Sequence, residues 1–186
     1  GEIVDLETLA TLGTSKNAIN PGRMCIFEYI YFARPDSRIR NNLLWQARYE
    51  MGRQLAIEDP EKNSDIVMPV PETGNPCAAG FAAQSGLPLT PAIVKNHYVG
   101  RTFIKPEQSQ RMEAVRIKLN VMRDLVQGKN VMVMEDSIVR GTTTKILVQK
   151  LKDAGAKRVS LAISSPPIKF PCFYGIDTGV RKDLIA

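Results

Sequence analysis

The residues best suited to chemistry in this chain are two adjacent carboxylates, Glu135 and Asp136, and the hydroxyl-rich loop that follows them. Apolar residues 131–134 precede the acids, and a helical pattern starts at Thr142. Carboxylates can accept hydrogen bonds from sugar hydroxyls or lie near a metal ion, whereas loop amides and a helix N-terminus can bind phosphate. The segment predicts a sugar-phosphate site. The alternative is an ordinary strand–turn–helix with an acidic corner.

Strand-like and helical patterns alternate along the rest of the chain. Strands are predicted at 25–32, 66–68, 92–94, 131–134 and 158–163. Helices are predicted from Asp36 or Ser37 to Leu55, at 77–83, at 112–126 and at 142–154, with stops near Gly86, Gly128 and Gly155. This alternation indicates an α/β fold with a mostly parallel sheet. Parallel sheets bind ligands at the carboxyl ends of their strands, where the segments after Met68, Val94 and Met134 fall.

Length and composition fit one domain. Of the 186 residues, 44% are hydrophobic and 24% are charged, as in ordinary globular proteins. We expect a lead-in or linker segment at 1–20 and a domain at 21–186. No apolar run reaches membrane-spanning length, no secretory signal opens the chain, and the three cysteines show no disulfide framework. A cytoplasmic location is therefore expected.

The formal net charge of +6 favours an anionic partner. From Lys95 to Arg123 there are seven basic and two acidic residues, with Tyr98 and Phe103 as the aromatic residues. Few aromatic residues argue against base stacking and therefore against a nucleic acid. A polyphosphate ligand fits better, and neither nucleic acid nor membrane is expected as a partner.

The acidic segment resembles a known family motif. Its sequence Asp-Ser-Ile-Val-Arg-Gly-Thr-Thr, at 136–143, is similar to the phosphoribosyl pyrophosphate (PRPP) motif of the type I phosphoribosyltransferases, in the form found in the glutamine PRPP amidotransferases. The resemblance extends over 23–186, through segments 27–37, 69–73, 95–104 and 165–177 in the same order. It implies a type I phosphoribosyltransferase-like α/β fold, with a mostly parallel sheet flanked by helices and a long flexible loop.

The resemblance implies a reaction and roles for individual residues. Ammonia would displace pyrophosphate from C1 of PRPP and give 5-phosphoribosylamine, the first step of de novo purine synthesis. Thr73, Glu135 and Asp136 correspond to the positions that hold Mg²⁺ and the ribose hydroxyls. PRPP binding is also implied for Glu72, Ser137, Val139, Arg140, Gly141, Thr142, Thr143 and Thr144. Lys95, Tyr98 and Arg101 correspond to catalytic positions, with Tyr98 and Arg101 in a loop that closes over substrate. Glu135 stands where the family more often has Asp.

The resemblance also implies groups and partners outside this segment. Cys25 and Cys172 match two ligands of a [4Fe–4S] cluster that one subgroup carries, so a cluster is expected in a full-length protein only, since two thiolates cannot hold it alone. A glutaminase domain precedes this domain in the family, so we expect this chain to use ammonia and not glutamine. Purine-nucleotide inhibitors and a homo-oligomer are further expectations. The alternatives are a PRPP-binding regulator and a nucleobase salvage phosphoribosyltransferase.

Overall fold

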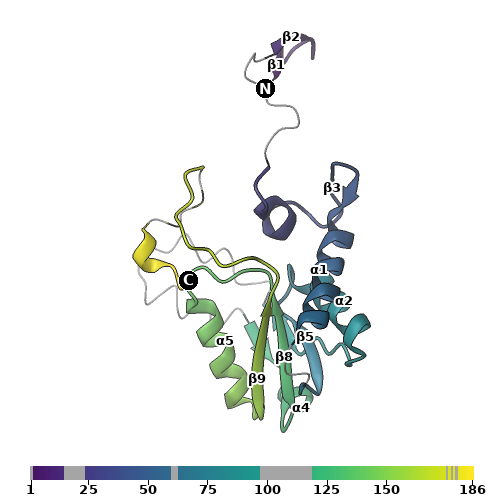
Figure 1. The fold of residues 1–186 in the computed structure, drawn as a ribbon, viewed down its shortest axis with the longest axis vertical. Helices are drawn as coiled ribbons and strands as arrows, with labels where there is room; N and C mark the ends of the chain where they lie inside the picture. Colours follow the sequence, from purple (N-terminus) through teal and green to yellow (C-terminus); the bar gives the residue numbers. More distant parts are fainter. Residues whose placement is uncertain are drawn as a thin grey trace.

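A three-stranded parallel sheet forms the centre of the protein (Figure 1). The computed structural model describes residues 2–14, 24–59, 63–96, 119–174, 176, 178 and 180–186. The sheet has the order β5 (Ile66–Pro69), β8 (Asn130–Glu135) and β9 (Arg158–Ile163), so β8 is bonded on both sides. Because β5 and β8 are almost wholly buried, they are continuous apolar runs without alternation. The predicted α/β fold with a parallel sheet is confirmed.

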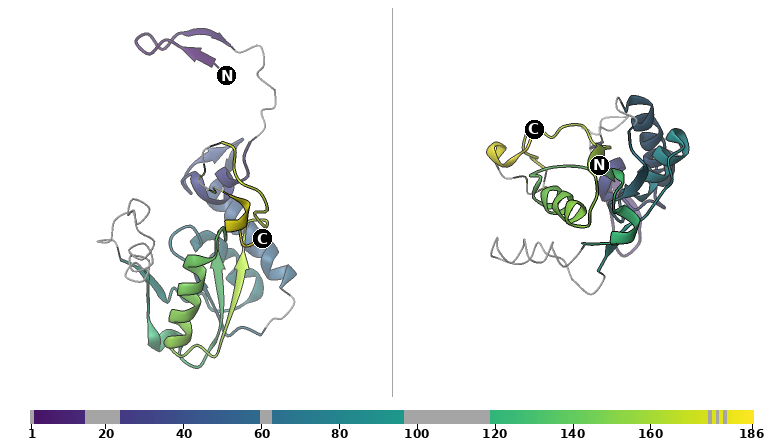
Figure 2. Two further views of the ribbon diagram at one scale, coloured as in Figure 1. Left: turned by 90° about the vertical axis from the view of Figure 1, so that its left-hand side faces the viewer. Right: turned by 90° about the horizontal axis from the view of Figure 1, so that it is seen from below.

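Helices cover both faces of the sheet (Figure 2). On one face α5 (Thr142–Asp153) packs Leu147 and Leu151 against Val131 and Val133 of β8. On the other face α1 (Leu44–Glu58) and α2 (Asn75–Ser85) contribute to a second core, with Ala56 and Phe81 against Met132 and Met134. Successive β8 side chains therefore enter opposite cores, as the pleat of a strand requires. Among the described residues, no helix combines the length and apolar character needed to cross a membrane.

Several predicted elements are confirmed and have clear ends. The strands predicted at 66–68, 131–134 and 158–163 are β5, β8 and β9. The helices predicted at 77–83 and 142–154 are α2 and α5. Gly86 ends α2 with φ of 76° and Gly155 follows α5 with φ of 88°. Both angles lie in the left-handed region, which glycine adopts without steric cost, so these stops are readable from the sequence.

Three predictions were wrong in detail. The strand predicted at 25–32 is instead the short helix η1 (Glu28–Phe32). The helix predicted from Asp36 or Ser37 begins only at Leu44, because β3 (Arg38–Ile39) and β4 (Asn42–Leu43) form a hairpin first. The helix predicted at 112–126 contains β7 (Leu119–Val121) before the short α4 (Arg123–Val126), and its residues before 119 lie outside the described residues.

The strand predicted at 92–94 exists as β6 (Ile93–Lys95), but it pairs with β7 and not with the central sheet. The pairing is antiparallel, and Lys95 lies opposite Leu119. The remaining elements are β1 (Glu2–Val4) and β2 (Thr11–Thr14), which form an antiparallel hairpin within the predicted lead-in, and η3 (Arg181–Asp183) near the C-terminus.

A buried arginine explains why residues 28–32 are helical. Arg48 of α1 is 3% exposed, and its guanidinium donates to the carbonyls of Tyr29 at 2.7 Å and Ala33 at 2.8 Å. Burial lowers the pKa of Arg48, while the charge of Asp136 opposes that shift. A buried cation needs such acceptors to offset its lost hydration. The carbonyls of Tyr29 in η1 and of Ala33 directly after it are therefore engaged by a side chain rather than by a neighbouring strand.

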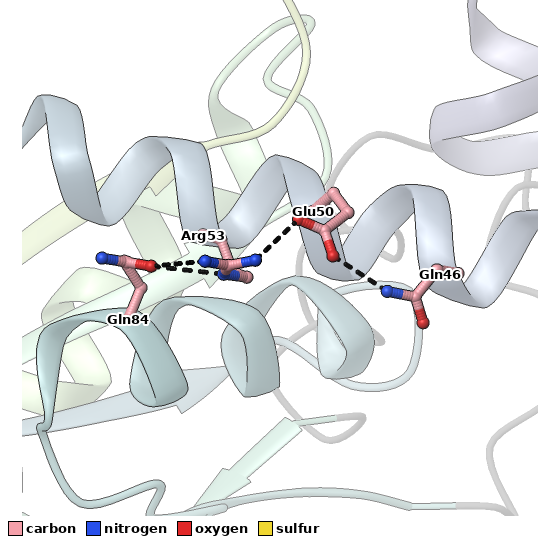
Figure 3. Close-up of polar contacts among 4 residues, drawn as sticks. All are labelled: Gln46, Glu50, Arg53 and Gln84. Carbon is pink, nitrogen blue, oxygen red and sulfur yellow. Dashed lines mark hydrogen bonds and ion pairs between the residues drawn. The ribbon is translucent and has the colours of Figure 1, made fainter.

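We expect Arg48→Met to lower the free energy of unfolding by about 2–4 kcal/mol, because it leaves two carbonyls without their donor. Arg53→Met is the matched control. Arg53 lies on the exposed side of the same helix, where it pairs with Glu50 at 3.3 Å and Gln84 at 3.0 Å (Figure 3). That loss should stay below about 1 kcal/mol. Urea unfolding of both variants measures the difference, and equal losses would contradict the assigned role of Arg48.

Candidate functional site

The candidate site lies where the parallel neighbours β5 and β8 end side by side. Pro69 at the end of β5 is opposite Met134, and the Val70 amide donates to the Met134 carbonyl at 2.9 Å. Glu135 is the last residue of β8 and Asp136 follows it directly. From the loop after β5, the Thr73 hydroxyl donates to the Asp136 carboxylate. Two segments 63 residues apart in sequence therefore meet at one edge of the sheet.

A glycine allows the loop after β5 to lie close to β8. A Cβ atom at Gly74 would lie 2.6 Å from the Met134 carbonyl oxygen and 2.8 Å from that of Val70. Both neighbours are backbone atoms that cannot move aside, so only glycine allows this approach. The same loop contains a cis peptide bond between Pro71 and Glu72. The close approach brings Thr73 within reach of Asp136.

Hydroxyl groups surround the acid pair. Asp136 accepts from Thr73 through one carboxylate oxygen and from the Ser137 hydroxyl, at 2.6 Å, through the other. Glu135 accepts from the Thr144 hydroxyl at 3.1 Å. Each acid is 8% exposed. The carboxylates are thus fixed in orientation by donors from three segments, and ligand hydroxyls could replace or join those donors.

The loop between the acids and α5 leads into a helix N-terminus. Gly141 precedes the helix with φ of 71°, and α5 follows with three threonines. The first amides of a helix lack intrahelical acceptors and carry a partial positive charge, so they favour an anion. Within this loop Ser137 and Val139 are half-buried, Arg140 is exposed and Gly141 is buried. Thr142 and Thr143 are exposed, whereas Thr144 is buried against Glu135.

Burial raises the pKa of Glu135 to about 7, an effect that the Thr144 hydrogen bond opposes and the charge of Asp136 reinforces. The sheet edge therefore holds one carboxyl group that changes its charge near neutral pH. The Glu135 carboxyl is therefore poised between two protonation states, because desolvation disfavours the charged form.

This shift predicts a pH dependence of stability. Below about pH 4.5 the Glu135 carboxyl is protonated whether the chain is folded or unfolded. As the pH rises to about 7, the unfolded chain has released the proton that the folded chain still holds, so stability falls. Above pH 7 the loss is complete and amounts to roughly 3 kcal/mol.

Urea unfolding without divalent metal, repeated from pH 5 to pH 8, tests this expectation. Glu135→Gln should flatten the wild-type decline, because the amide does not titrate. Glu58→Gln, at an exposed carboxylate on α1, serves as the control and should keep the wild-type profile. A Glu135→Gln profile as steep as that of the wild type would show that another group titrates.

The structure brings some of the other predicted residues to this edge. Glu72 is exposed beside Thr73, and its carboxylate lies 4.0 Å from the Nζ atom of Lys95. Lys95 is half-buried at the end of β6, so this ion pair links the loop after β5 to the β6 end. Tyr98 and Arg101, predicted to be catalytic, lie outside the described residues.

The three cysteines lie in different settings. Cys25 is exposed just before η1, and Cys172 is half-buried in the segment after β9, where its sulfur accepts from the Tyr174 amide at 3.3 Å. Burial raises the pKa of Cys77 to about 12, as expected of a thiol that packs on α2. In the part of the chain that the structure describes, no three His, Cys, Asp or Glu side chains gather as a metal site. The cluster ligands therefore stay a prediction.

The sequence analysis missed Ser164, whereas Ser165 begins the segment 165–177 that carries part of the resemblance. Ser164 and Ser165 follow β9, and their amides donate to the carbonyls of Glu135 at 3.1 Å and Asp136 at 2.8 Å. The Ser164 hydroxyl adds a bond to the Asp136 carbonyl at 3.2 Å. Their place at the carboxyl end of a third parallel strand was the available signal.

The chain is similar in sequence to known proteins over part of their length. No protein-family model matches the chain. The amidophosphoribosyltransferase of Archaeoglobus fulgidus is 54% identical over 163 residues, which are 88% of this chain and 35% of the relative. The human amidophosphoribosyltransferase is 44% identical over 191 residues, covering 100% of this chain and 36% of the relative.

Among solved structures, the glutamine PRPP amidotransferase from B. subtilis complexed with ADP and GMP superposes with a TM-score of 0.75 at 48% identity. The match covers 87% of this chain and 35% of that one. The chain therefore spans about a third of the length of the relatives it matches.

Proposed function

The chain is homologous to the amidophosphoribosyltransferases over about a third of their length, and we propose that it is their phosphoribosyltransferase part. In this proposal the sheet edge binds PRPP, and ammonia displaces pyrophosphate from C1 to give 5-phosphoribosylamine. The observation that carries the proposal is the contact between Thr73 and Asp136. It joins the loop after β5 to the acid pair beside the N-terminus of α5. Such a site suits a ligand with a phosphate at one end and a ribose ring next to it.

Each part of the substrate would contact a different group of residues in the site. The amides of the loop from Ser137 to Gly141 and the first turn of α5 face the 5′-phosphate, which the helix dipole favours. Asp136 and Glu135 accept from the ribose hydroxyls. Lys95 lies across from Glu72, where a cation would face the pyrophosphate group. Tyr98 and Arg101 are proposed to cover the substrate and exclude water, which would otherwise compete with ammonia at C1.

The oxygen atoms at and around Asp136 are suitable ligands for a magnesium ion. Magnesium takes one or two protein carboxylates and keeps several waters, and Asp136 with the neighbouring Thr73 and Glu135 offers such a set. When bound, magnesium would neutralise charge on the departing pyrophosphate. The chain's own residues orient the carboxylates through the hydroxyls of Thr73 and Thr144. The bond from C1 to the pyrophosphate oxygen breaks as the bond from ammonia to C1 forms, and the transition state resembles an oxocarbenium ion.

Further features of the whole protein are part of the proposal. A separate glutaminase part would supply ammonia, and purine nucleotides would regulate the protein. The free thiols of Cys25 and Cys77 support a cytoplasmic location. A homo-oligomer and a [4Fe–4S] cluster that uses Cys25 and Cys172 remain predictions about the full-length protein.

Pyrophosphate release from PRPP tests the proposal. With magnesium present, release should depend on ammonia and should yield 5-phosphoribosylamine. The other arms replace ammonia with glutamine or with free nucleobases. Turnover with a nucleobase but not with ammonia would favour a salvage enzyme. PRPP binding without turnover in any arm would favour a regulator, and either result would overturn the proposal.

A further inference from the structure

The segment after β9 binds the backbone of the loop that leads from the acid pair to α5. Ser164 and Ser165 donate their amides to the carbonyls of Glu135 and Asp136, at the start of the loop. At its other end the Ile185 amide donates to the Val139 carbonyl at 3.0 Å. In Figure 1 the C-terminal end of the chain lies beside this loop at the top of α5. Three backbone amides from one segment therefore bind three carbonyls of the other.

Holding a carbonyl in one direction fixes the amide that follows it. A peptide unit is planar, and in the trans form its C=O and N–H groups point in opposite directions. Pro71–Glu72 is the cis bond found among the described residues, so the unit joining Val139 to Arg140 is trans. Because the Ile185 amide binds the Val139 carbonyl, the Arg140 N–H must point away from Ile185. An anion bound on the side of the loop away from Ile185 would meet that N–H group.

Ile185 lies against the start of α5, and the segment before it has contacts of its own. A Cβ at Gly141 would lie 2.7 Å from the Ile185 Cδ1 atom, so the isoleucine covers the glycine that starts α5. Further back, the Arg181 guanidinium lies over the Phe170 ring at 4.9 Å. The buried Thr178 hydroxyl accepts from the Cys172 amide at 2.7 Å. These contacts fold the segment after β9 onto itself before it reaches the loop.

We propose that Ile185 is a positioning residue for the 5′-phosphate, acting through the hydrogen bond from its amide to the Val139 carbonyl. The inference rests on the proposed function, because it assigns the loop to the phosphate of PRPP. Ile185 need not contact the substrate. It holds the peptide unit whose N–H group meets the phosphate, and it should leave the pyrophosphate end of the site untouched.

Ile185→Pro removes the amide hydrogen and tests this role. Leu184 has φ of −81° and ψ of 142°, a conformation that a residue before proline adopts readily. Ile185→Ala keeps the amide and is the matched control. We expect Ile185→Pro to weaken ribose 5-phosphate binding roughly five- to tenfold, the size of one hydrogen bond, and Ile185→Ala to change it less than about twofold. Calorimetric titration with ribose 5-phosphate and, separately, with magnesium pyrophosphate measures both halves of the site.

Pyrophosphate binding should stay unchanged in both variants, which a general loss of structure would not allow. Equal weakening of both ligands by Ile185→Pro, no weakening at all, or equal weakening by the alanine variant would overturn the positioning role. If wild-type protein binds neither ribose 5-phosphate nor PRPP, the proposed function itself fails.

A measurement without any variant guards against misfolding of Ile185→Pro. Hydrogen exchange of the wild-type Ile185 amide should slow at least threefold with saturating ribose 5-phosphate, because a ligand that needs the bond also stabilises it. Magnesium pyrophosphate should leave that rate unchanged. Exchange that responds to neither ligand, or to both alike, would count against the coupling.

Discussion

Asp136→Asn is expected to lower kcat/KM for PRPP by roughly 30- to 1000-fold while the fold stays intact. The acid lies at the end of the central strand, with its two oxygens oriented by the hydroxyls of Thr73 and Ser137. The amide has the same shape but no charge, and one of its two positions is a donor instead of an acceptor. Loss of one such electrostatic contact costs about 2–4 kcal/mol in the transition state.

Steady-state kinetics with ammonia at saturating magnesium measures this loss. Asp153→Asn, an exposed position at the end of α5, makes the same chemical change away from the site and should retain wild-type rates. Unfolding by urea should show that both variants are folded. Unchanged kinetics in Asp136→Asn would remove the acid from the proposed site.

Gly52→Ala is expected to cause the largest loss of stability, about 3 kcal/mol or more. A Cβ at Gly52 of α1 would lie 1.9 Å from the Cys77 carbonyl oxygen of α2. Gly80 of α2 makes the reciprocal approach, since its Cβ would lie 1.9 Å from the Tyr49 carbonyl oxygen. Two backbones meet at these points, so overpacking cannot be relieved by a rotamer change and the helices must separate.

Gly13→Ala is the control for this substitution, because no atom lies within 4 Å of a Cβ at that position. Thermal or urea unfolding should show a change below about 0.5 kcal/mol for Gly13→Ala. If Gly52→Ala were as stable as the control, the close helix contact would be wrong. Gly52→Ala should also reduce activity, since α2 starts directly after the loop that carries Thr73.

The parts of the fold that were predictable are those encoded by local sequence. The apolar runs of β5 and β8 are buried on both faces, and α2 and α5 are followed by Gly86 and Gly155 in left-handed conformations. Each of these signals lies within a few residues of the element it defines. By contrast, η1 consists of residues that favour strands, and its helical form depends on Arg48, which lies elsewhere in the sequence.

The other two errors have different origins. The spacing of apolar residues around Leu119 suits a helix, but Leu119 pairs with Lys95 of β6. The turn before α1 uses Arg40 and Asn41 at positive φ, which glycine-based turn rules do not anticipate. The hairpin of β3 and β4 is local, whereas Lys95 is a partner of Leu119 that is distant in sequence. Local propensity cannot identify such partners.

In the candidate site, too, some residues can be predicted from local sequence and others cannot. Glu135, Asp136 and the following hydroxyls are contiguous, so the sequence alone revealed them as a group. Thr73 was added through the resemblance of segment 69–73 to the family, and the common edge at which parallel strands end agrees with that assignment. Ser165 and Ile185 contribute backbone amides, which every residue except proline has, and no side-chain pattern distinguishes them.

The central place of β8 determines which parts of the site can open. Hydrogen bonds to β5 and β9 on both sides, with a core on each face, make this strand the last to exchange its amide hydrogens. The acids at its end are therefore carried by the slowest-opening element of the protein. Fluctuations that admit a substrate or release a product must come from the segments around the acids, so release rates can be altered by changing those segments while the acid pair keeps its place.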